Sequence, residues 1–274
     1  MNFSTSFNIA DFNVNVDSKP IVIAEISANH NGSIEMAKSL ILAAKESGAD
    51  GVKLQTYTPD TMTIDSKNND FLINGGLWDG YTLYELYKEA HTPYAWHKEL
   101  FDYAREIDLL CFSTPFDETA VDLLEELKVP AYKIASFEVT DIPLIQYVAE
   151  KKKPMIISTG MANEQEIVDC LETVATAGVS EVILLHCVSG YPTPFDQYNI
   201  KTIKLQPASI HTIASRWAGC VIIGRVIIAE TAVIDHASAT ACPAVIHNGR
   251  TAANTKTIFH RIAVACCLPS SIII

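Results

Sequence analysis

The feature that most constrains the fold of this chain is a series of short apolar runs, each bounded by turn residues. The runs have the length of strands and are almost continuously apolar, which is typical of strands buried on both faces of a parallel sheet. Amphipathic helical patterns separate them, so the order strand, helix, strand predicts an α/β fold with helices covering a parallel sheet. The six runs are residues 20–27, 51–57, 109–116, 131–138, 154–160 and 181–187.

Two of the intervening helices have recognisable ends. The pattern over residues 33–48 begins at Ser33, a good N-cap residue, and stops at Gly48. The pattern over residues 163–178 is ended in the same way by Gly178. These start and stop signals predict one helix between the first and second apolar runs and another between the fifth and sixth.

Composition excludes several classes of protein. The chain has 274 residues, of which 49% are hydrophobic, enough for a substantial core. We expect a cytoplasmic protein, because the sequence shows no basic-then-apolar signal segment and no uncharged apolar run of about 18 residues. A net charge of −12 argues against a nucleic-acid partner. The seven cysteines have no CxxC or metal-finger spacing, which predicts reduced thiols.

Polar residues collect toward the C-terminal end of each apolar run. In a (β/α)₈ TIM barrel the active site is built at that end of the strands, so recurrence on six strands predicts one shared pocket. Burying so many polar groups without a ligand would be costly. No Gly-rich dinucleotide or P-loop motif follows any run, which disfavours nucleotide folds. The residues are Glu25, Lys53, Gln55, Ser113, Thr114, Lys133, Ser136, Glu138, Ser158, Thr159, His186 and Ser189.

Each of these residues also has a purely structural interpretation. A single lysine such as Lys53 or Lys133 can be solvated or ion-paired, and Glu25 alone can cap a helix. His186 fits a hydrogen-bonded core histidine better than a metal ligand. The functional interpretation therefore depends on the coincidence of the whole set.

Six motifs of the sequence resemble successive strand-end motifs of the sialic acid synthase family. They are AEISANHNGS (24–33), GVKLQTYTPDT (51–61), CFSTPFD (111–117), YKIASFE (132–138), STGMA (158–162) and HCVSGYPTP (186–194). The resemblance extends from about residue 18 to about residue 204. Within the family, residues 71–97 resemble the pseudaminic acid synthases more than the N-acetylneuraminate synthases.

The resemblance implies a TIM barrel that condenses phosphoenolpyruvate with an open-chain amino sugar. The C3 carbon attacks the sugar aldehyde, water adds at C2 and phosphate leaves. For the pseudaminic branch the sugar is a 2,4-diacetamido-2,4,6-trideoxy-hexose and the product is a nonulosonic acid. Glu25, Lys133 and Glu138 are the implied catalytic residues, with the two glutamates as alternatives for proton transfer. The implied substrate-binding residues are Lys53, Gln55, Thr114, Ser136, Ser158, Ser189 and Tyr191.

Three alternatives stay open at this point. The sugar could be N-acetylmannosamine, as in N-acetylneuraminate synthases, and residues 71–97 favour the diacetamido sugar instead. The chain could be a catalytically dead fragment. Lys133 could also serve as the Schiff-base nucleophile of an aldolase, since a strand-borne lysine in a barrel suits that chemistry.

Residues 206–274 depart from the family pattern, so we divide the chain into a barrel portion, 1–205, and an atypical segment, 206–274, without family motifs. Only six of the eight barrel strands are recognisable, so we expect an incomplete TIM barrel. From residue 206 onward there are only two acidic residues against five basic ones, and hydrophobic periodicity is lost. The SDH-type and EKHF-type motifs, whose histidines hold a divalent metal (Mn or Mg) in the family, are missing, so we identify no metal ligands. His211, His236, His247 and His260 lack the family context. The antifreeze-like C-terminal domain, through which family homodimers complete each other's sites, is also absent from the sequence.

We predict that residues from about 206 onward are encoded in a shifted reading frame, because acids, periodicity and motifs disappear at one point. Translation of the two neighbouring frames of the coding DNA tests this directly. We expect SDH-like and EKHF-like motifs to emerge in one of them. Absence of both motifs from both frames would contradict the hypothesis.

Overall fold

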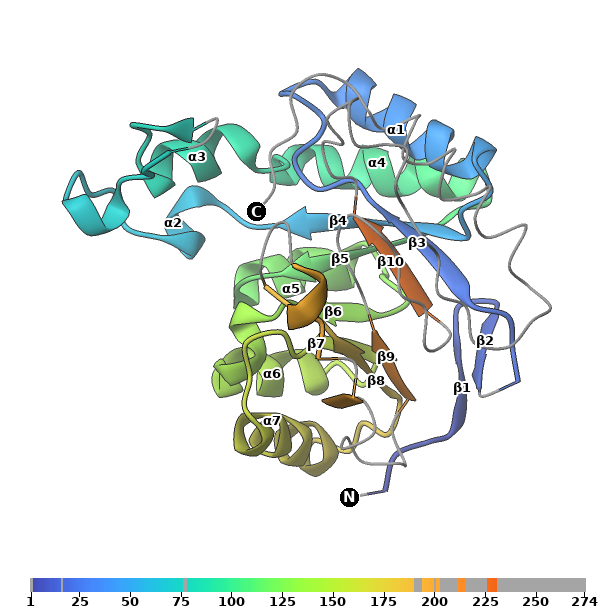
Figure 1. Cartoon of the computed structure of the whole chain (residues 1–274). Coiled ribbons are helices and arrows are strands. Elements are labelled where there is room, and N and C mark those ends of the chain that lie inside the picture. Colours follow the sequence, from blue (N-terminus) through green and yellow to red (C-terminus); the bar gives the residue numbers. More distant parts are fainter. Residues whose placement is uncertain are drawn as a thin grey trace.

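A curved sheet of parallel strands is the centre of the fold (Figure 1). The computed structural model describes residues 2–15, 17–75, 78–189, 194–199, 201–202, 211–214 and 226–230. Eight strands are hydrogen-bonded in the order β10-β3-β4-β5-β6-β7-β8-β9, and every neighbouring pair is parallel. The curvature and the covering helices confirm the predicted TIM-barrel type.

The six predicted strands are confirmed, each slightly shorter than its apolar run. The largest difference concerns residues 131–138, because the chain leaves the sheet after Ile134 and enters a short 3₁₀ helix, η3 (Phe137–Thr140). Ser136 and Glu138 therefore follow the strand instead of alternating along it. The strands are β3 (Ile21–Glu25), β4 (Gly51–Thr56), β5 (Leu110–Pro115), β6 (Tyr132–Ile134), β7 (Met155–Ser158) and β8 (Val182–His186).

Two further strands come from the segment 206–274, where the sequence predicted none. Strand β9 (His211–Ala214) pairs with β8, and β10 (Val226–Glu230) pairs with β3. They occupy the two edges of the sheet. An unpaired strand at the edge of a sheet readily pairs with another strand. A short segment can therefore form a strand at an edge even where the sequence shows no alternation of strands and helices.

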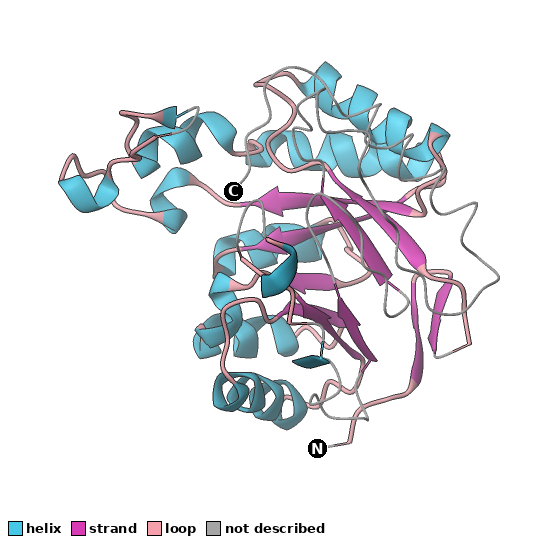
Figure 2. Cartoon of the chain, in the orientation of Figure 1, coloured by secondary structure: helices cyan, strands magenta, loops and turns pink. Residues whose placement is uncertain are grey.

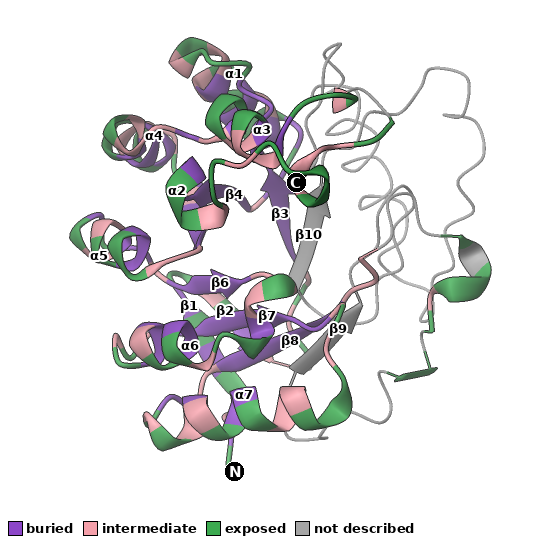
Figure 3. Ribbon diagram, turned by 90° about the vertical axis from the view of Figure 1, so that its left-hand side faces the viewer, coloured by how far each residue is buried: buried purple, intermediate pink, exposed green. Residues whose placement is uncertain are grey.

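Five helices cover the outer face of the sheet (Figure 2). Four are capped by side chains that accept a backbone N–H: Ser33, Asp117, Asp141 and Asn163. Ser33 and the stop at Gly48, which has a φ of +88°, confirm the helix predicted over 33–48. Figure 3 shows the buried strands in purple beside helices with exposed green faces. The helices are α1 (Ile34–Glu46), α4 (Tyr94–Glu106), α5 (Glu118–Glu126), α6 (Ile142–Ala149) and α7 (Glu164–Thr176).

A long connection between β4 and α4 forms an arm beyond the C-terminal end of β4 (Figure 1). It carries α2 (Pro59–Met62), η1 (Asn69–Phe71) and α3 (Leu83–Ala90). Another short 3₁₀ helix, η4 (Phe195–Gln197), follows β8. None of the helices in the described ranges combines the length and the hydropathy that crossing a membrane would require.

An N-terminal hairpin packs against the inner face of the sheet at the opposite end of the strands. Its strands β1 (Ser6–Ile9) and β2 (Phe12–Asn15) are antiparallel. Phe7, Ile9 and Val14 form one apolar cluster with inner residues of four strands and with Ala131, which directly precedes β6, so the hairpin fills the N-terminal end of the barrel interior. Those inner residues are Ile21, Ile23, Phe112, Ala131, Ile156, Ile183 and Leu185.

We predict that Gly51→Ala destabilises the protein by about 1–3 kcal/mol, because overpacking a filled interior forces side chains and backbone apart. An alanine Cβ would lie 2.8 Å from both Leu110 Cβ and Leu110 O, and 2.9 Å from Ile23 Cδ1. Urea unfolding measures the change. Glu172→Ala, on the exposed side of α7, is the control and should change stability by less than about 0.5 kcal/mol. Equal stability of the two variants would contradict the steric argument.

Candidate active site

The inner face of the sheet changes from apolar to polar toward the C-terminal ends of the strands. On β3, Ile21 and Ile23 join the inner apolar cluster, and Glu25 follows two positions later. Alternate residues of a strand face the same side, so Glu25 faces inward as well. Thr114 likewise follows the inner residue Phe112 by two positions, and Ser158 follows Ile156 by two, so both face inward. All of the predicted strand-borne site residues are buried: Glu25, Lys53, Gln55, Thr114, Lys133 and Ser158.

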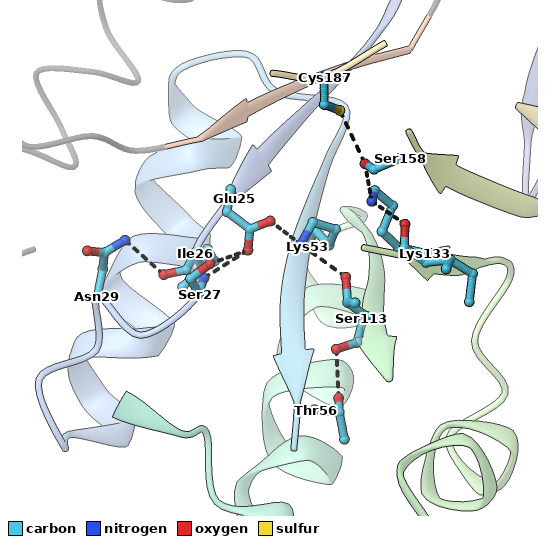
Figure 4. A network of polar contacts seen from close by, with 12 residues as sticks. Glu25, Ile26, Ser27, Asn29, Lys53, Thr56, Ser113, Lys133, Ser158 and Cys187 are labelled. Carbon is cyan, nitrogen blue, oxygen red and sulfur yellow. Dashed lines mark hydrogen bonds and ion pairs between the residues drawn. The ribbon is translucent and has the colours of Figure 1, made fainter. Parts of the chain in front are cut away.

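Glu25 and Lys53 form a buried ion pair between adjacent strands (Figure 4). The side chains are only 4% and 5% exposed, so both charges depend on protein partners. Lys53 Nζ also donates a hydrogen bond to Thr114 Oγ1 at 3.2 Å. The other carboxylate oxygen of Glu25 accepts hydrogen bonds from Ser27 N at 3.0 Å and Ser27 Oγ at 2.7 Å. The pair is thereby held in one geometry.

Ser27 reaches Glu25 twice because its backbone is left-handed, with a φ of +41°. This conformation is unfavourable for a residue other than glycine and costs about 1 kcal/mol or more. It turns the chain back directly after β3, which brings both the amide and the hydroxyl to the same oxygen. The strained backbone of Ser27 thus holds the Glu25 carboxylate in one position.

Lys133 anchors the second half of the site. Its Nζ donates to Ser158 Oγ at 2.5 Å and to the carbonyl oxygen of Ile134 at 2.6 Å. Ser158 Oγ also accepts from Cys187 Sγ at 3.3 Å. These contacts connect β6, β7 and the residue after β8 (Figure 4).

Three hydroxyls of the site are oriented by the groups that donate to them. Thr114 accepts from Lys53, Ser158 accepts from Lys133, and Ser136 accepts from the N–H of Gly160 at 3.2 Å. A hydroxyl that accepts in this way keeps its own hydrogen for another acceptor. Three oriented donors beside two ammonium groups form an arrangement suited to an anion.

Glu138 lies half-buried just after β6, and burial raises its pKa from 4.5 to about 7. The positive charge of Lys133 opposes this rise in pKa but does not cancel it. Among the described residues, its Oε2 is buried without a hydrogen-bond partner. A carboxyl group with this pKa exchanges its proton near neutral pH, as an acid-base catalyst must.

Two polar residues from the strand ends do not belong to the inner site. Ser113 faces the helices, where its Oγ lies 2.6 Å from Thr56 Oγ1, and that oxygen lies 2.8 Å from His97 Nε2. Thr159 donates to the carbonyl oxygen of Leu185 at 3.0 Å. The prediction of one pocket was wrong for these two, because each directly adjoins an inward-facing residue and so faces the other side.

The remaining predicted residues are placed as follows. His186 Nε2 lies 2.9 Å from the carbonyl oxygen of Tyr198, which confirms the interpretation as a hydrogen-bonded core histidine. Ser189 is half-buried close to Gly160. Tyr191 lies outside the described residues, as do His236 and His247.

The described part of the chain contains no cluster of three or more His, Cys, Asp or Glu side chains that could hold a metal ion. His211 lies on β9, where only the backbone is described, and His260 is outside the described ranges. The described residues therefore do not provide the divalent-metal site implied by the family resemblance.

Sequence analysis missed three residues of the site. Ser27 fixes Glu25, Cys187 contacts Ser158, and Gly160 donates to Ser136. Ser27 follows Glu25 by two residues, a spacing that allows a local turn, and this signal was available. Cys187 and Gly160 lie within the motifs HCVSGYPTP and STGMA, but no sequence signal singled them out, because their contacts connect separate strands.

The arm after β4 is held by its own apolar residues. Trp78 stacks edge-on against Tyr81 with ring centroids 5.2 Å apart, and Ile73 and Trp78 pack against a small cluster that includes Ala28. The cluster ties the arm to the loop after β3. The preference for the diacetamido sugar that residues 71–97 indicate stays a prediction.

Comparison with known proteins agrees with this geometry. The model of the NeuB family matches residues 40–213, which is more than half of the chain. The chain belongs to the NeuB family. This membership confirms the resemblance to sialic acid synthases found in the sequence.

Several curated relatives are pseudaminic acid synthases. The one from Campylobacter jejuni subsp. jejuni serotype O:23/36 is 48% identical over 191 residues, covering 70% of this chain and 56% of that protein. The one from Helicobacter pylori is 49% identical over 181 residues, covering 66% of this chain and 53% of that protein. The chain thus spans about half the length of these relatives.

The fold is shared with a solved NeuB-type structure. The crystal structure of N-acetylneuraminic acid synthetase from Leptospira borgpetersenii serovar Hardjo-bovis superposes with a TM-score of 0.75. The superposition covers 97% of this chain and 90% of that one at 20% identity. At that identity the likeness supports the barrel fold alone.

Proposed function

We propose that this chain belongs to an enzyme that condenses phosphoenolpyruvate with 2,4-diacetamido-2,4,6-trideoxy-hexose to give a nonulosonic acid and phosphate. The choice of sugar is supported by the two pseudaminic acid synthases that resemble this chain at 48% and 49% identity. The structural observation that carries the proposal is the set of three oriented hydroxyls beside Lys53 and Lys133.

Phosphoenolpyruvate suits these donors because it carries both a carboxylate and a phosphate. Lys53 and Lys133 supply positive charge, and Thr114, Ser136 and Ser158 supply hydroxyl hydrogens. Charge-assisted hydrogen bonds of this kind are about twice as strong as neutral ones. The proposal therefore assigns the inner polar end of the barrel to the anion.

The two glutamates differ in a way that divides their roles. Glu25 is paired with Lys53 and held by Ser27, so it fixes the lysine. Glu138 has the pKa near 7 and is the better acid-base group. When C3 bonds to the aldehyde carbon, the aldehyde oxygen must gain a proton, and the water that adds at C2 must lose one. We assign Glu138 to proton transfer and Glu25 to positioning.

The aldolase alternative is less well supported by the geometry. A Schiff-base lysine must be neutral to attack a carbonyl, whereas Lys133 donates to both Ser158 and a backbone carbonyl. These two acceptors stabilise the ammonium form. The N-acetylmannosamine and dead-fragment alternatives are outcomes of the assay below.

Phosphate release by the purified chain tests the function. We expect release with phosphoenolpyruvate and the diacetamido sugar in the presence of manganese, and at least about tenfold less with N-acetylmannosamine, a difference of about 1.4 kcal/mol. Lys133→Met should abolish release, because a buried charge contact to the anion is lost. Lys98→Met, whose side chain is 77% exposed, is the matched control.

Preference for N-acetylmannosamine would replace the sugar in the proposal. No release with either sugar, from folded protein that still binds phosphoenolpyruvate, would identify the chain as a catalytically dead fragment.

Glu138→Gln should lower turnover by about 10²–10⁴-fold and remove a limb near pH 7 from the pH–rate profile. A glutamine cannot exchange a proton, so the limb disappears if Glu138 is its source. If Glu138 acts as a base, wild-type activity falls below pH 7, where the group is protonated; if it acts as an acid, activity falls above pH 7. Glu172→Gln on the exposed side of α7 should leave the profile unchanged. Persistence of the limb in Glu138→Gln would assign it to another group.

A further inference from the structure

Gly160 occupies the point where the chain segments after β6, β7 and β8 meet. An alanine Cβ built at this position would lie 2.8 Å from Ser189 Oγ, 2.9 Å from Ser136 Oγ and 3.0 Å from Cys187 Cβ. Real Cβ atoms essentially never approach other heavy atoms within 3.0 Å. A side chain at position 160 therefore fits only if Ser136, Ser189 or Cys187 shifts.

Backbone conformation does not explain this glycine. Gly160 is not among the glycines of the described chain that have a positive φ, such as Gly178 at +84°. A residue with a side chain could adopt its backbone angles, so only the three close neighbours require glycine here. Two of these neighbours are hydroxyls proposed above as substrate contacts.

The two hydroxyls belong to different parts of the proposed site. Ser136 accepts the Gly160 N–H at 3.2 Å and is proposed to contact phosphoenolpyruvate. Ser189 is one of the substrate-binding residues implied by the family resemblance, in the loop after β8 that resembles the family's sugar-contacting loop, and we assign it to the sugar. Gly160 lies between them and approaches both, so the spacing of the two hydroxyls depends on the missing side chain.

We propose that Gly160 is a positioning residue, whose lack of a side chain sets the distance between Ser136 and Ser189 and thereby the placement of phosphoenolpyruvate. This inference rests on the proposed function and adds a residue to it. A methyl group at position 160 pushes Ser136 and Ser189 apart. The oriented Ser136 hydroxyl then no longer points at the anion.

Isothermal titration with phosphoenolpyruvate, combined with thermal unfolding, tests the assignment without requiring turnover. Four proteins form a cycle: the unsubstituted chain, Gly160→Ala, Ser189→Ala and the double variant. We expect Gly160→Ala to weaken binding about tenfold or more. Ser189→Ala gives the reference affinity for phosphoenolpyruvate against which the double variant is compared.

The double variant separates positioning from general damage. Removing Ser189 Oγ takes away the 2.8 Å contact, so the methyl group gains room and part of the affinity for phosphoenolpyruvate returns. The 2.9 Å contact with Ser136 Oγ remains, so the double variant should still bind several-fold more weakly than Ser189→Ala. If Gly160→Ala alone does not fold, comparing the double variant with Ser189→Ala still tests the positioning role.

Each outcome decides one of the two proposals. The positioning role is overturned if Gly160→Ala binds phosphoenolpyruvate as tightly as the unsubstituted chain. It is also overturned if the double variant binds as tightly as Ser189→Ala. Either result leaves the proposed function intact. Failure of the folded, unsubstituted chain to bind phosphoenolpyruvate overturns the proposed function and this assignment with it. Weakened binding with partial recovery in the double variant supports both.

Discussion

The structure depends on the strict alternation of side chains along strands that are buried on both faces. Outward residues such as Val52 and Leu54 pack against the helices, while inward residues on the same strand form the barrel interior. Because the interior is apolar at one end and polar at the other, each strand supplies both core and site. A change of one position in register would exchange these two faces and place Glu25 and Lys53 among the helices.

The buried pair of Glu25 and Lys53 is the most demanding consequence of this arrangement. Two charges removed from water lose several kcal/mol of hydration each, and their mutual attraction repays this only when the geometry is good. Ser27 and Thr114 complete that geometry with hydrogen bonds to the carboxylate and the ammonium group. Replacing the pair by apolar residues of similar size is often neutral or stabilising in proteins. Its presence here is therefore better explained by the chemistry of the site than by stability.

Much of the fold and part of the site could be predicted from the sequence. The apolar runs located all six central strands, and strand-end position identified Lys53, Lys133 and Ser158 as neighbours. Strand-end position alone could not separate Thr114 from Ser113, because adjacent residues on a strand end both look polar and only their direction differs; only the family resemblance named Thr114 and left out Ser113. The sequence also did not single out Gly160, because the atoms that crowd its Cβ position belong to segments that are distant in sequence and meet only in the folded chain. Strands β9 and β10 were missed because their stability comes from sheet edges made elsewhere in the chain.

The N-terminal hairpin has a consequence for the order of folding. A two-stranded hairpin is at best marginally stable alone, so β1 and β2 need the barrel interior to hold them. That interior includes Ile183 and Leu185, and Ser4 hydrogen-bonds to Ser180 across 176 positions of the sequence. Contacts between such distant segments form slowly, because a long loop must close before they can contribute. The hairpin therefore depends on segments far along the chain, and we expect it to be among the last parts of the barrel to reach its final place.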